Sequence, residues 1–409
     1  MKYLAPFYLI TSIIIFNFIL ERVLDYLNSK FWSPDLPKEL NDVYDPHQYK
    51  KSQLYKKAND KFTLFTNSFS FIVVISMLVL GGFGYIDSIA RKFSDNPIIV
   101  ALIFFGILLL ASDLVNTPFS IYDTFVIEER FGFNKTNVIT YILDKLKGWL
   151  LTAIIGGGII ALIVWFSEIT AYFWLFAWIA ISVFMVFMNM FYSSLIVPLF
   201  NKQTPLEEGE LKDAIEKFCR EVNFKLDNVF VIDGSKRSTK ANAYFAGLGS
   251  KKRIVLYDTL INDLSKEEIV AVLAHEIGHY KKKHVIHSII TSIIQTGITL
   301  YIFSLFTVNY LLSRALGAEV HSIHMVLIAF GVIYSPISTI VGLFMNIISR
   351  KNEYAADRYA KDKLNPKYLI SALKKLSSNT LSNLVPHPAY VFFHYSHPTL
   401  LQRIRALNA

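Results

Sequence analysis

Seven long stretches without a charged residue constrain this chain more than any other feature of its sequence. They cover residues 3–20, 62–86, 96–112, 148–167, 169–201, 284–313 and 320–349. A helix needs about 20 apolar residues to cross the roughly 30 Å hydrocarbon core of a bilayer. The stretches therefore predict seven transmembrane helices, of which the third, with 17 residues, is marginal.

The composition supports a polytopic membrane protein. Of the 409 residues, 53% are hydrophobic and only 18% are charged, against about 25% charged residues in an ordinary soluble domain. So much apolar surface needs lipid around it, which argues against disorder and against a soluble multidomain enzyme. The first stretch is not read as a cleaved signal peptide, because Glu21 and Arg22 follow where a small-residue cleavage site should be.

The positive charges lie on one side of the predicted spans. All but four of the 41 lysines and arginines follow the first, third, fifth or seventh stretch. Because Lys and Arg gather in cytoplasmic loops, the N-terminus is predicted outside and the C-terminus in the cytoplasm. The net charge of +9 is then a signal of topology, and no nucleic-acid partner is expected.

Two stretches outside the spans, residues 202–283 and 350–409, are long enough to fold. By topology both are cytoplasmic, so we expect one domain built from the two, interrupted by spans six and seven at 284–349. Residues 1–201 would hold the first five spans and their loops. Within this part, the mixed-charge residues 21–61 are expected to be a solvated connection.

Local patterns predict an α+β domain with a small sheet. Thr204-Pro-Leu-Glu207 is a capping box that should start a helix running to about residue 222. The runs 228–232 and 253–257 are typical of strands, and 247–250 of a turn, which suggests a sheet or hairpin. A second capping box, Ser265 to Glu268, should start a helix that continues through residue 279.

That second helix carries His275-Glu-Ile-Gly-His279, the H-E-x-x-H pattern. Residues four apart share a helix face, so His275 and His279 can reach one Zn²⁺ at about 2.0 Å. Glu276 is rotated by about 100° and can face a water held by the metal. The single cysteine, Cys219, excludes an internal disulfide and a cysteine-based metal cluster, and is expected to be a packing residue.

A catalytic zinc usually has three protein ligands, so a third is needed. Other residues occupy the places of a third histidine after the motif. Asn352-Glu-Tyr-Ala-Ala-Asp357, just after the seventh span, offers a distant glutamate on the same side of the membrane. Glu353 could bind the metal while Asp357 accepts the N–H of a ligating imidazole. Alone, this pair would be most simply an acidic pair on a charged helix.

With this metal set in place, the sequence resembles the integral-membrane zinc endopeptidases of the CAAX prenyl protease type I family. The resemblance covers nearly the whole chain. Besides the zinc motif, it is carried by the segments Tyr122–Lys135, Pro198–Lys202, Ala241–Phe245, Arg350–Asp357 and Tyr395–Pro398, in the order of the family.

The resemblance implies a fold and further site residues. The fold would be mostly α, with seven tilted helices around a water-filled chamber and the zinc site at its cytoplasmic end. Asn242 and Ala243 would bind an extended substrate backbone, and His397 and Arg403 would stabilise the oxyanion. On the residues alone, Asn242 is a turn residue, His397 a capping histidine and Arg403 a surface arginine.

The resulting hypothesis is a zinc-dependent membrane endopeptidase with one catalytic Zn²⁺ held by His275, His279 and Glu353. Glu276 would take a proton from the metal-bound water as it attacks the scissile carbonyl, and pass it to the leaving amine. The resemblance implies cleavage near the C-terminus of prenylated CAAX sequences, or of other membrane-associated polypeptides. The bilayer is the other expected partner, and a monomer is allowed.

Two alternatives stay open at this point. A heat-shock-type membrane quality-control zinc protease shares H-E-x-x-H and the later glutamate but is shorter, with fewer spans. A non-enzymatic seven-helix transporter or receptor would hold no stoichiometric zinc. The compact chain, ending in Leu-Asn-Ala without a retrieval signal, favours a bacterial inner membrane over the endoplasmic reticulum of a eukaryote.

Overall fold

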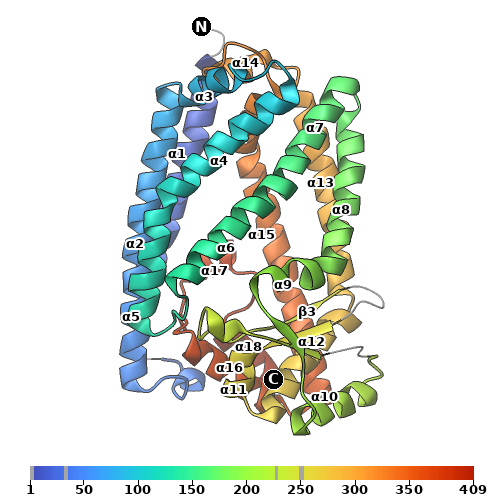
Figure 1. Cartoon of the computed structure of the whole chain (residues 1–409). Helices are drawn as coiled ribbons and strands as arrows, with labels where there is room; N and C mark the ends of the chain where they lie inside the picture. The colour runs from blue at the N-terminus through green and yellow to red at the C-terminus, as the bar shows by residue number, and fades with distance from the viewer. Residues whose placement is uncertain (1–3, 32–35, 226–228, 248–252) are drawn as a thin grey trace.

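The computed structural model describes residues 4–31, 36–225, 229–247 and 253–409. Within them, seven helical segments are long and apolar enough to cross a membrane, as predicted. They run along the long axis of the molecule, above a layer of short helices and strands that holds the C-terminus (Figure 1). The segments are α1 (Leu4–Lys30), α2 (Pro46–Val79), α4 to α5 (Pro97–Phe131), α6 to α7 (Val138–Ile169), α8 to α9 (Phe173–Phe200), α13 (His284–Phe306) and α15 (Ile323–Lys363).

The segments pack sparsely against one another. Only 6% to 22% of the residues in the apolar part of each are buried, so most of their side chains keep part of their surface open to lipid or water. Two of the segments contain a π-helical turn, η2 (Asp123–Glu128) and η3 (Thr152–Gly156). Such turns inside α-helices are rare and frequently lie at functional sites.

The ends of several helices differ from the predicted stretches. The second stretch ran to residue 86, but α2 ends at Val79 and a separate helix, α3 (Gly82–Arg91), follows. Gly81 lies between them with a φ of 70°, a conformation that favours glycine and breaks the helix without any charged residue to mark it. The sixth stretch likewise divides into α13 and the short α14 (Tyr310–Ala315).

The prediction of a solvated connection over residues 21–61 was wrong. Most of these residues extend α1 and α2 beyond their apolar parts, because α1 continues to Lys30 and α2 already begins at Pro46. Between the two helices, Leu40 of η1 (Lys38–Leu40), Val43 and Tyr44 are buried in a core with residues of the C-terminal segment. Mixed charge marks contact with water but does not distinguish a helix from a loop.

A four-stranded sheet lies in the layer below the spans. Its strands have the order β1–β2–β4–β3, with β2 and β4 parallel and the outer pairs antiparallel. The bounds are β1 (Gln203–Pro205), β2 (Val229–Ile232), β3 (Ala243–Ala246) and β4 (Arg253–Tyr257). The predicted strands correspond to β2 and β4, but they do not form a hairpin because they run parallel. Of the predicted turn at 247–250, residues 248–250 lie outside the described residues.

The capping box predicted at Thr204 does not form. Thr204 lies in β1, opposite Val231, and the helix α10 starts only at Glu210. The box at Ser265 is confirmed: the Ser265 hydroxyl accepts from the backbone of Glu268, whose carboxylate accepts from the backbone of Ser265. The helices of this layer are α10 (Glu210–Glu221), α11 (Asp258–Asp263), α12 (Lys266–Lys281), α16 (Pro366–Asn379), α17 (Pro388–His394) and α18 (Leu400–Asn408), with η4 (Gly234–Lys236).

One hydrophobic core joins the sheet to helices that precede α13 and to helices that follow α15 in the sequence. It contains Ile215 and Cys219 of α10, side chains of β4 and α12, and also Leu369 and Leu407. The last two come from beyond α15. The core therefore contains side chains from both sides of the hairpin formed by α13 and α15.

At the centre of this core, α12 crosses α15 at close range. A Cβ atom added at Gly278 would lie 3.1 Å from the Cα of Ala356 and 3.2 Å from its carbonyl oxygen. The distance between two packed helices depends on the side chains at their contact. Gly278 and Ala356, which is fully buried, therefore set how closely the two helices can approach.

We predict that Gly278→Ala destabilises the protein by about 1–3 kcal/mol, because the extra methyl group must push α12 and α15 apart. The measurement is thermal unfolding of the purified protein in detergent, together with metal content. Gly342→Ala, in α15, is the matched control, since an added Cβ there meets nothing within 4 Å. Equal unfolding temperatures for the two variants would contradict the close contact.

Candidate metal centre

Three side chains from two helices converge below the spans. His275 and His279 lie one turn apart on α12, and their Nε2 atoms are 3.2 Å apart. Glu353 reaches them from α15, with Oε2 3.4 Å from the Nε2 of His275 and Oε1 3.2 Å from the Nε2 of His279. The structure thus brings together the three residues predicted to bind a metal.

The spacing of these atoms fits a small tetrahedral ion. Bonds of 2.0–2.1 Å in a tetrahedral zinc site separate the ligand atoms by about 3.3–3.4 Å, close to the 3.2 Å between the two histidine nitrogens. The two carboxylate oxygens of Glu353 lie at similar distances, each from a different histidine, and one ligand atom from each residue lies within 4.8 Å of the others. In addition, Glu353 Oε2 is buried without a hydrogen bond of good geometry. Two imidazoles and a carboxylate are a donor set that zinc accepts. The residues present therefore fit a metal ion bound at this point.

His275 is held by Asp357 on the side of its ring away from Glu353. Its Nδ1 lies 2.8 Å from Oδ1 of Asp357, which leaves Nε2 free to face the other two side chains. Asp357 is in turn held by Arg403, whose Nη2 and Nε donate to the two carboxylate oxygens at 2.6 and 2.9 Å. Such a chain of partners fixes both the ring orientation and the tautomer of a metal-binding histidine.

The C-terminal segment completes one side of the site. His397, between α17 and α18, lies with Nδ1 3.0 Å from Glu353 Oε2, and its side chain is 63% exposed. Arg403 of α18 lies with Nη1 3.8 Å from the same oxygen. Both residues named from the resemblance are therefore at the site, although their local sequence alone gave no reason to place them there.

A further histidine, His284, lies at the site without having been assigned a role from the sequence. Its Nδ1 is 3.0 Å from the Nδ1 of His279, on the side of that ring opposite to Nε2. The helix is interrupted between them, since α12 ends at Lys281 and Lys283 has a φ of 59°. Because of this break, helical spacing carried no signal that His284 would turn back toward His279.

The electrostatics distinguish two neighbouring titratable groups of α12, His275 and Glu276. Burial raises the pKa of the Glu276 carboxyl, and the neighbouring imidazoles oppose this only in part. For His275, burial alone would lower the pKa, but hydrogen bonds to Asp357 and Glu353 outweigh it and raise the pKa to about 9. Glu276 is thus shifted toward the range in which a carboxylate can accept a proton near neutral pH.

The strand β3 lies at the edge of the sheet, next to the site. Asn242 precedes it, and the carbonyl oxygen of Asn242 accepts from the backbone N–H of Tyr257. The side chain of Asn242 accepts from the N–H of Ala243, the first residue of β3, at 2.8 Å. Among the described residues β3 pairs only with β4, which leaves its other edge free for an added strand.

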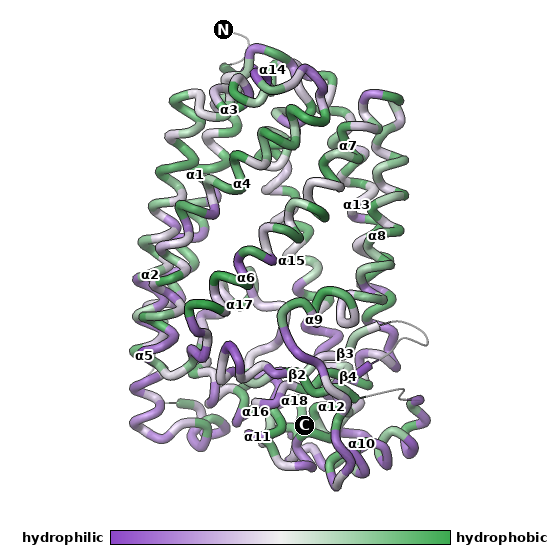
Figure 2. Tube along the Cα trace, in the orientation of Figure 1, coloured by the Kyte–Doolittle hydropathy of each residue, from purple (hydrophilic) through white to green (hydrophobic). Residues whose placement is uncertain are grey.

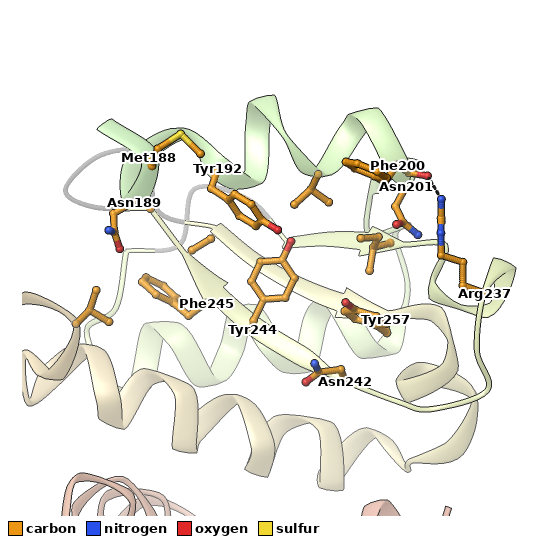
Figure 3. A pocket seen from close by; sticks show the side chains of 15 residues that line it. Met188, Asn189, Tyr192, Phe200, Asn201, Arg237, Asn242, Tyr244, Phe245 and Tyr257 are labelled. Atoms are coloured by element: carbon orange, nitrogen blue, oxygen red, sulfur yellow. Dashed lines mark hydrogen bonds between the residues drawn. The ribbon is translucent and has the colours of Figure 1, made fainter. Parts of the chain in front are cut away.

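A cavity of about 770 Å³ lies between this sheet and the helices α8 and α9. Figure 3 shows Tyr192 of α8 and Tyr244 of β3 extending toward each other inside it, with Asn242 at the rim. Val285, which follows His284, also lines the cavity. Most of the other lining residues are apolar or aromatic. An extended chain beside β3 could place alternate side chains here.

Comparison with known proteins links both parts of the chain to one kind of protein. Residues 205–409 match the family described as Peptidase family M48. Residues 26–202 match the family described as CAAX prenyl protease N-terminal, five membrane helices.

Individual relatives match over nearly their whole length. CAAX prenyl protease 1 of Saccharomyces cerevisiae is 36% identical, and the alignment covers 98% of this chain and 94% of the relative. The CAAX prenyl protease 1 homolog of Homo sapiens is 32% identical, with 91% and 88% covered. The crystal structure of S. mikatae Ste24p superposes with a TM-score of 0.93 at 34% identity, covering 99% of each chain.

These matches favour the peptidase over both alternatives considered from the sequence. A transporter or receptor would not match a peptidase family over residues 205–409, and the similarity of the entire fold to Ste24p includes all seven membrane helices. The chain therefore belongs to peptidase family M48, with the CAAX prenyl proteases, and is a multi-pass membrane metalloendopeptidase.

Proposed function

We propose that this endopeptidase uses a single zinc ion held by His275, His279 and the Glu353 carboxylate. The observation that supports this most directly is the convergence of one ligand atom from each of the three residues within 4.8 Å of one another, with the two histidine Nε2 atoms 3.2 Å apart. When bound, zinc supplies a Lewis acid that polarises a peptide carbonyl and lowers the pKa of water.

Glu276 acts as the general base in this proposal. It takes a proton from the attacking water and delivers it to the leaving amine. Two features support the role. The residue lies one position from a ligand, on an adjacent face of α12, and burial raises its pKa. A carboxylate of ordinary pKa would be a weaker proton acceptor at neutral pH.

Arg403, His397 and Asp357 support the same reaction without binding the metal. Asp357 orients His275 through Nδ1. Arg403 and His397 donate toward the oxygen that becomes negative in the tetrahedral intermediate, and each donor of this kind can contribute several kcal/mol. Their positions beside Glu353, 3.0 and 3.8 Å from its Oε2, support the assignment.

The proposed substrate is an extended peptide that pairs with the free edge of β3. Asn242 and Ala243 bind its backbone, and the cavity lined by Tyr192 and Tyr244 receives an alternate side chain. The relatives are named CAAX prenyl proteases. We therefore propose cleavage near the C-terminus of prenylated CAAX sequences, with other membrane-associated polypeptides as further candidates.

The proposed orientation places the metal site in the cytoplasm. It rests on the positive charge, which lies almost entirely on the side of the spans that carries residues 202–283 and 350–409. These two segments form one protease domain in the proposal, and the core they share supports it. The membrane would be a bacterial inner membrane, or the endoplasmic reticulum in a eukaryote.

We predict that replacement of Glu276 by Gln lowers turnover by a factor of about 10²–10⁴, because proton transfer is lost, while the metal content is unchanged. Peptide cleavage and metal per protein are measured on the same preparation. Glu267→Gln, an exposed position in the first turn of the same helix, is the control and should keep full activity. Unchanged turnover in the Glu276 variant would remove the proposed base.

The affinity for zinc should increase with pH between about 6 and 9. In the metal-free protein the pKa of His275 is about 9, so the ring carries a proton at neutral pH that zinc must displace. Displacing one proton changes the affinity by about tenfold per pH unit. Competition with a chelator at several pH values measures this. Asp357→Asn removes a carboxylate that raises this pKa, and should flatten the dependence above pH 7; a flat profile in the unchanged protein contradicts the prediction.

A farnesylated C-terminal CAAX peptide should be cleaved more efficiently than its unprenylated twin if prenylated sequences are the substrate. The two peptides are compared by mass spectrometry, which also locates the cleaved bond. Glu276→Gln serves as the inactive control for contaminating proteases. Equal kcat/KM for both peptides would exclude prenyl specificity and leave the endopeptidase proposal intact.

A further inference from the structure

A second cavity, of about 860 Å³, lies between α1 and α2, far from β3. On α1 it is lined by Arg22, Asp25 and Tyr26, on α2 by Lys57 and Lys61, and on α17 by Tyr390. Arg22, Tyr26 and the further lining residue Ser29 follow one another at four and three positions, and Lys57 and Lys61 are four apart, so each helix presents one face to the cavity. Nothing in the proteolytic reaction uses this cavity.

The cavity lies where the apolar parts of both helices end. The uncharged stretch of α1 stops at residue 20, and that of α2 begins at residue 62. Figure 2 shows the same transition, as α2 changes from hydrophobic in its upper part to hydrophilic in its lower part. A protein that spans a bilayer with these stretches would place the cavity at the level of the lipid headgroups.

The charges in the cavity leave two ammonium groups in excess. Asp25 is paired with Arg22 Nη2 at 2.8 Å, and Asp60, which also lines the cavity, with Lys56 Nζ at 2.8 Å. Lys57 and Lys61 make no ion pair within the part of the chain that the structure describes, and both are exposed. They lie one turn apart on the same face of α2, so their charges add at one place.

The surface next to the cavity is apolar. On the membrane side, Ile19 and Val23 of α1 and Leu64 of α2 are each 49% to 54% exposed. Further into the membrane the helices close on each other, where the rings of Phe18 and Phe71 stack with centroids 4.1 Å apart. A polar, positively charged cavity thus joins an exposed apolar surface. This combination suits an amphiphile with an anionic head.

We propose that this cavity binds the headgroup of an anionic glycerophospholipid. Lys57 and Lys61 contact the phosphate, and the acyl chains lie along Ile19 and Leu64. Basic pockets between transmembrane helices bind anionic lipid headgroups in this way, and lysine binds phosphate as a point charge. The carboxylates of Asp25 and Asp60 can accept hydrogen bonds from headgroup hydroxyls. The site is independent of the metal centre.

The test compares lipid binding to the purified full-length protein in detergent micelles. Phosphatidylglycerol, phosphatidylcholine and inorganic phosphate are added separately, and binding is measured by native mass spectrometry and by thermal unfolding. We expect saturable binding of phosphatidylglycerol that raises the unfolding temperature, since a ligand of the folded state stabilises it. Phosphatidylcholine and inorganic phosphate should have little effect.

Two double variants separate the cavity from general surface charge. Lys57→Gln with Lys61→Gln should weaken phosphatidylglycerol binding at least tenfold. Lys50→Gln with Lys51→Gln removes the same charge from α2 about 10 Å further from the membrane, and should leave binding unchanged. Both variants should keep peptidase activity and metal content, which confirms folding.

Three results would overturn the proposal. Equal weakening in the two double variants would show only general attraction between positive charge and anionic lipid. Equal binding of phosphatidylcholine and phosphatidylglycerol would show that the headgroup charge is not recognised. Stabilisation by inorganic phosphate as large as that by phosphatidylglycerol would indicate a phosphate site instead of a lipid site.

Discussion

The crossing of α12 and α15 is the contact on which the rest of the structure depends. α15 has 41 residues and is therefore about 60 Å long, so the part that follows its uncharged stretch, residues 350–363, continues about 20 Å below it. This continuation carries Glu353 and Asp357 to His275. Because no loop intervenes, the height of the metal site relative to the membrane is set by a rigid helix, and a glycine at position 278 permits the approach.

The close approach of α12 and α15 buries charged side chains, and these side chains stabilise one another. Asp357 is 1% exposed and Glu353 4%, and a buried carboxylate without partners would cost several kcal/mol. Arg403 compensates Asp357 through two hydrogen bonds. Glu353 has His275, His279 and His397 around it, and in the proposed site it would share a cation with the first two.

Local sequence predicted those parts of the site that depend on local geometry. His275 and His279 follow from helical spacing, and Glu353 from its place after the last span. His397 and Arg403 depend on how α18 packs, so they could be named only through a resemblance. β3 was missed because Ala-Tyr-Phe-Ala has no β-branched residue, and β1 because a capping pattern over the same residues competed with it.

The membrane helices also contact the metal-site layer through the segment between α1 and α2. The segment between α1 and α2 buries Leu40 and Val43 in a core that includes Ile404, the residue next to Arg403, and Arg405 donates to Glu39 at 2.8 Å. The helix that holds Arg403 thus rests on the connection between the first two spans. A protease layer separated from the spans would lose this support together with the first half of α15. Spans and catalytic layer therefore form one structural unit, in which packing of the first two helices can bear on the position of a proposed oxyanion donor.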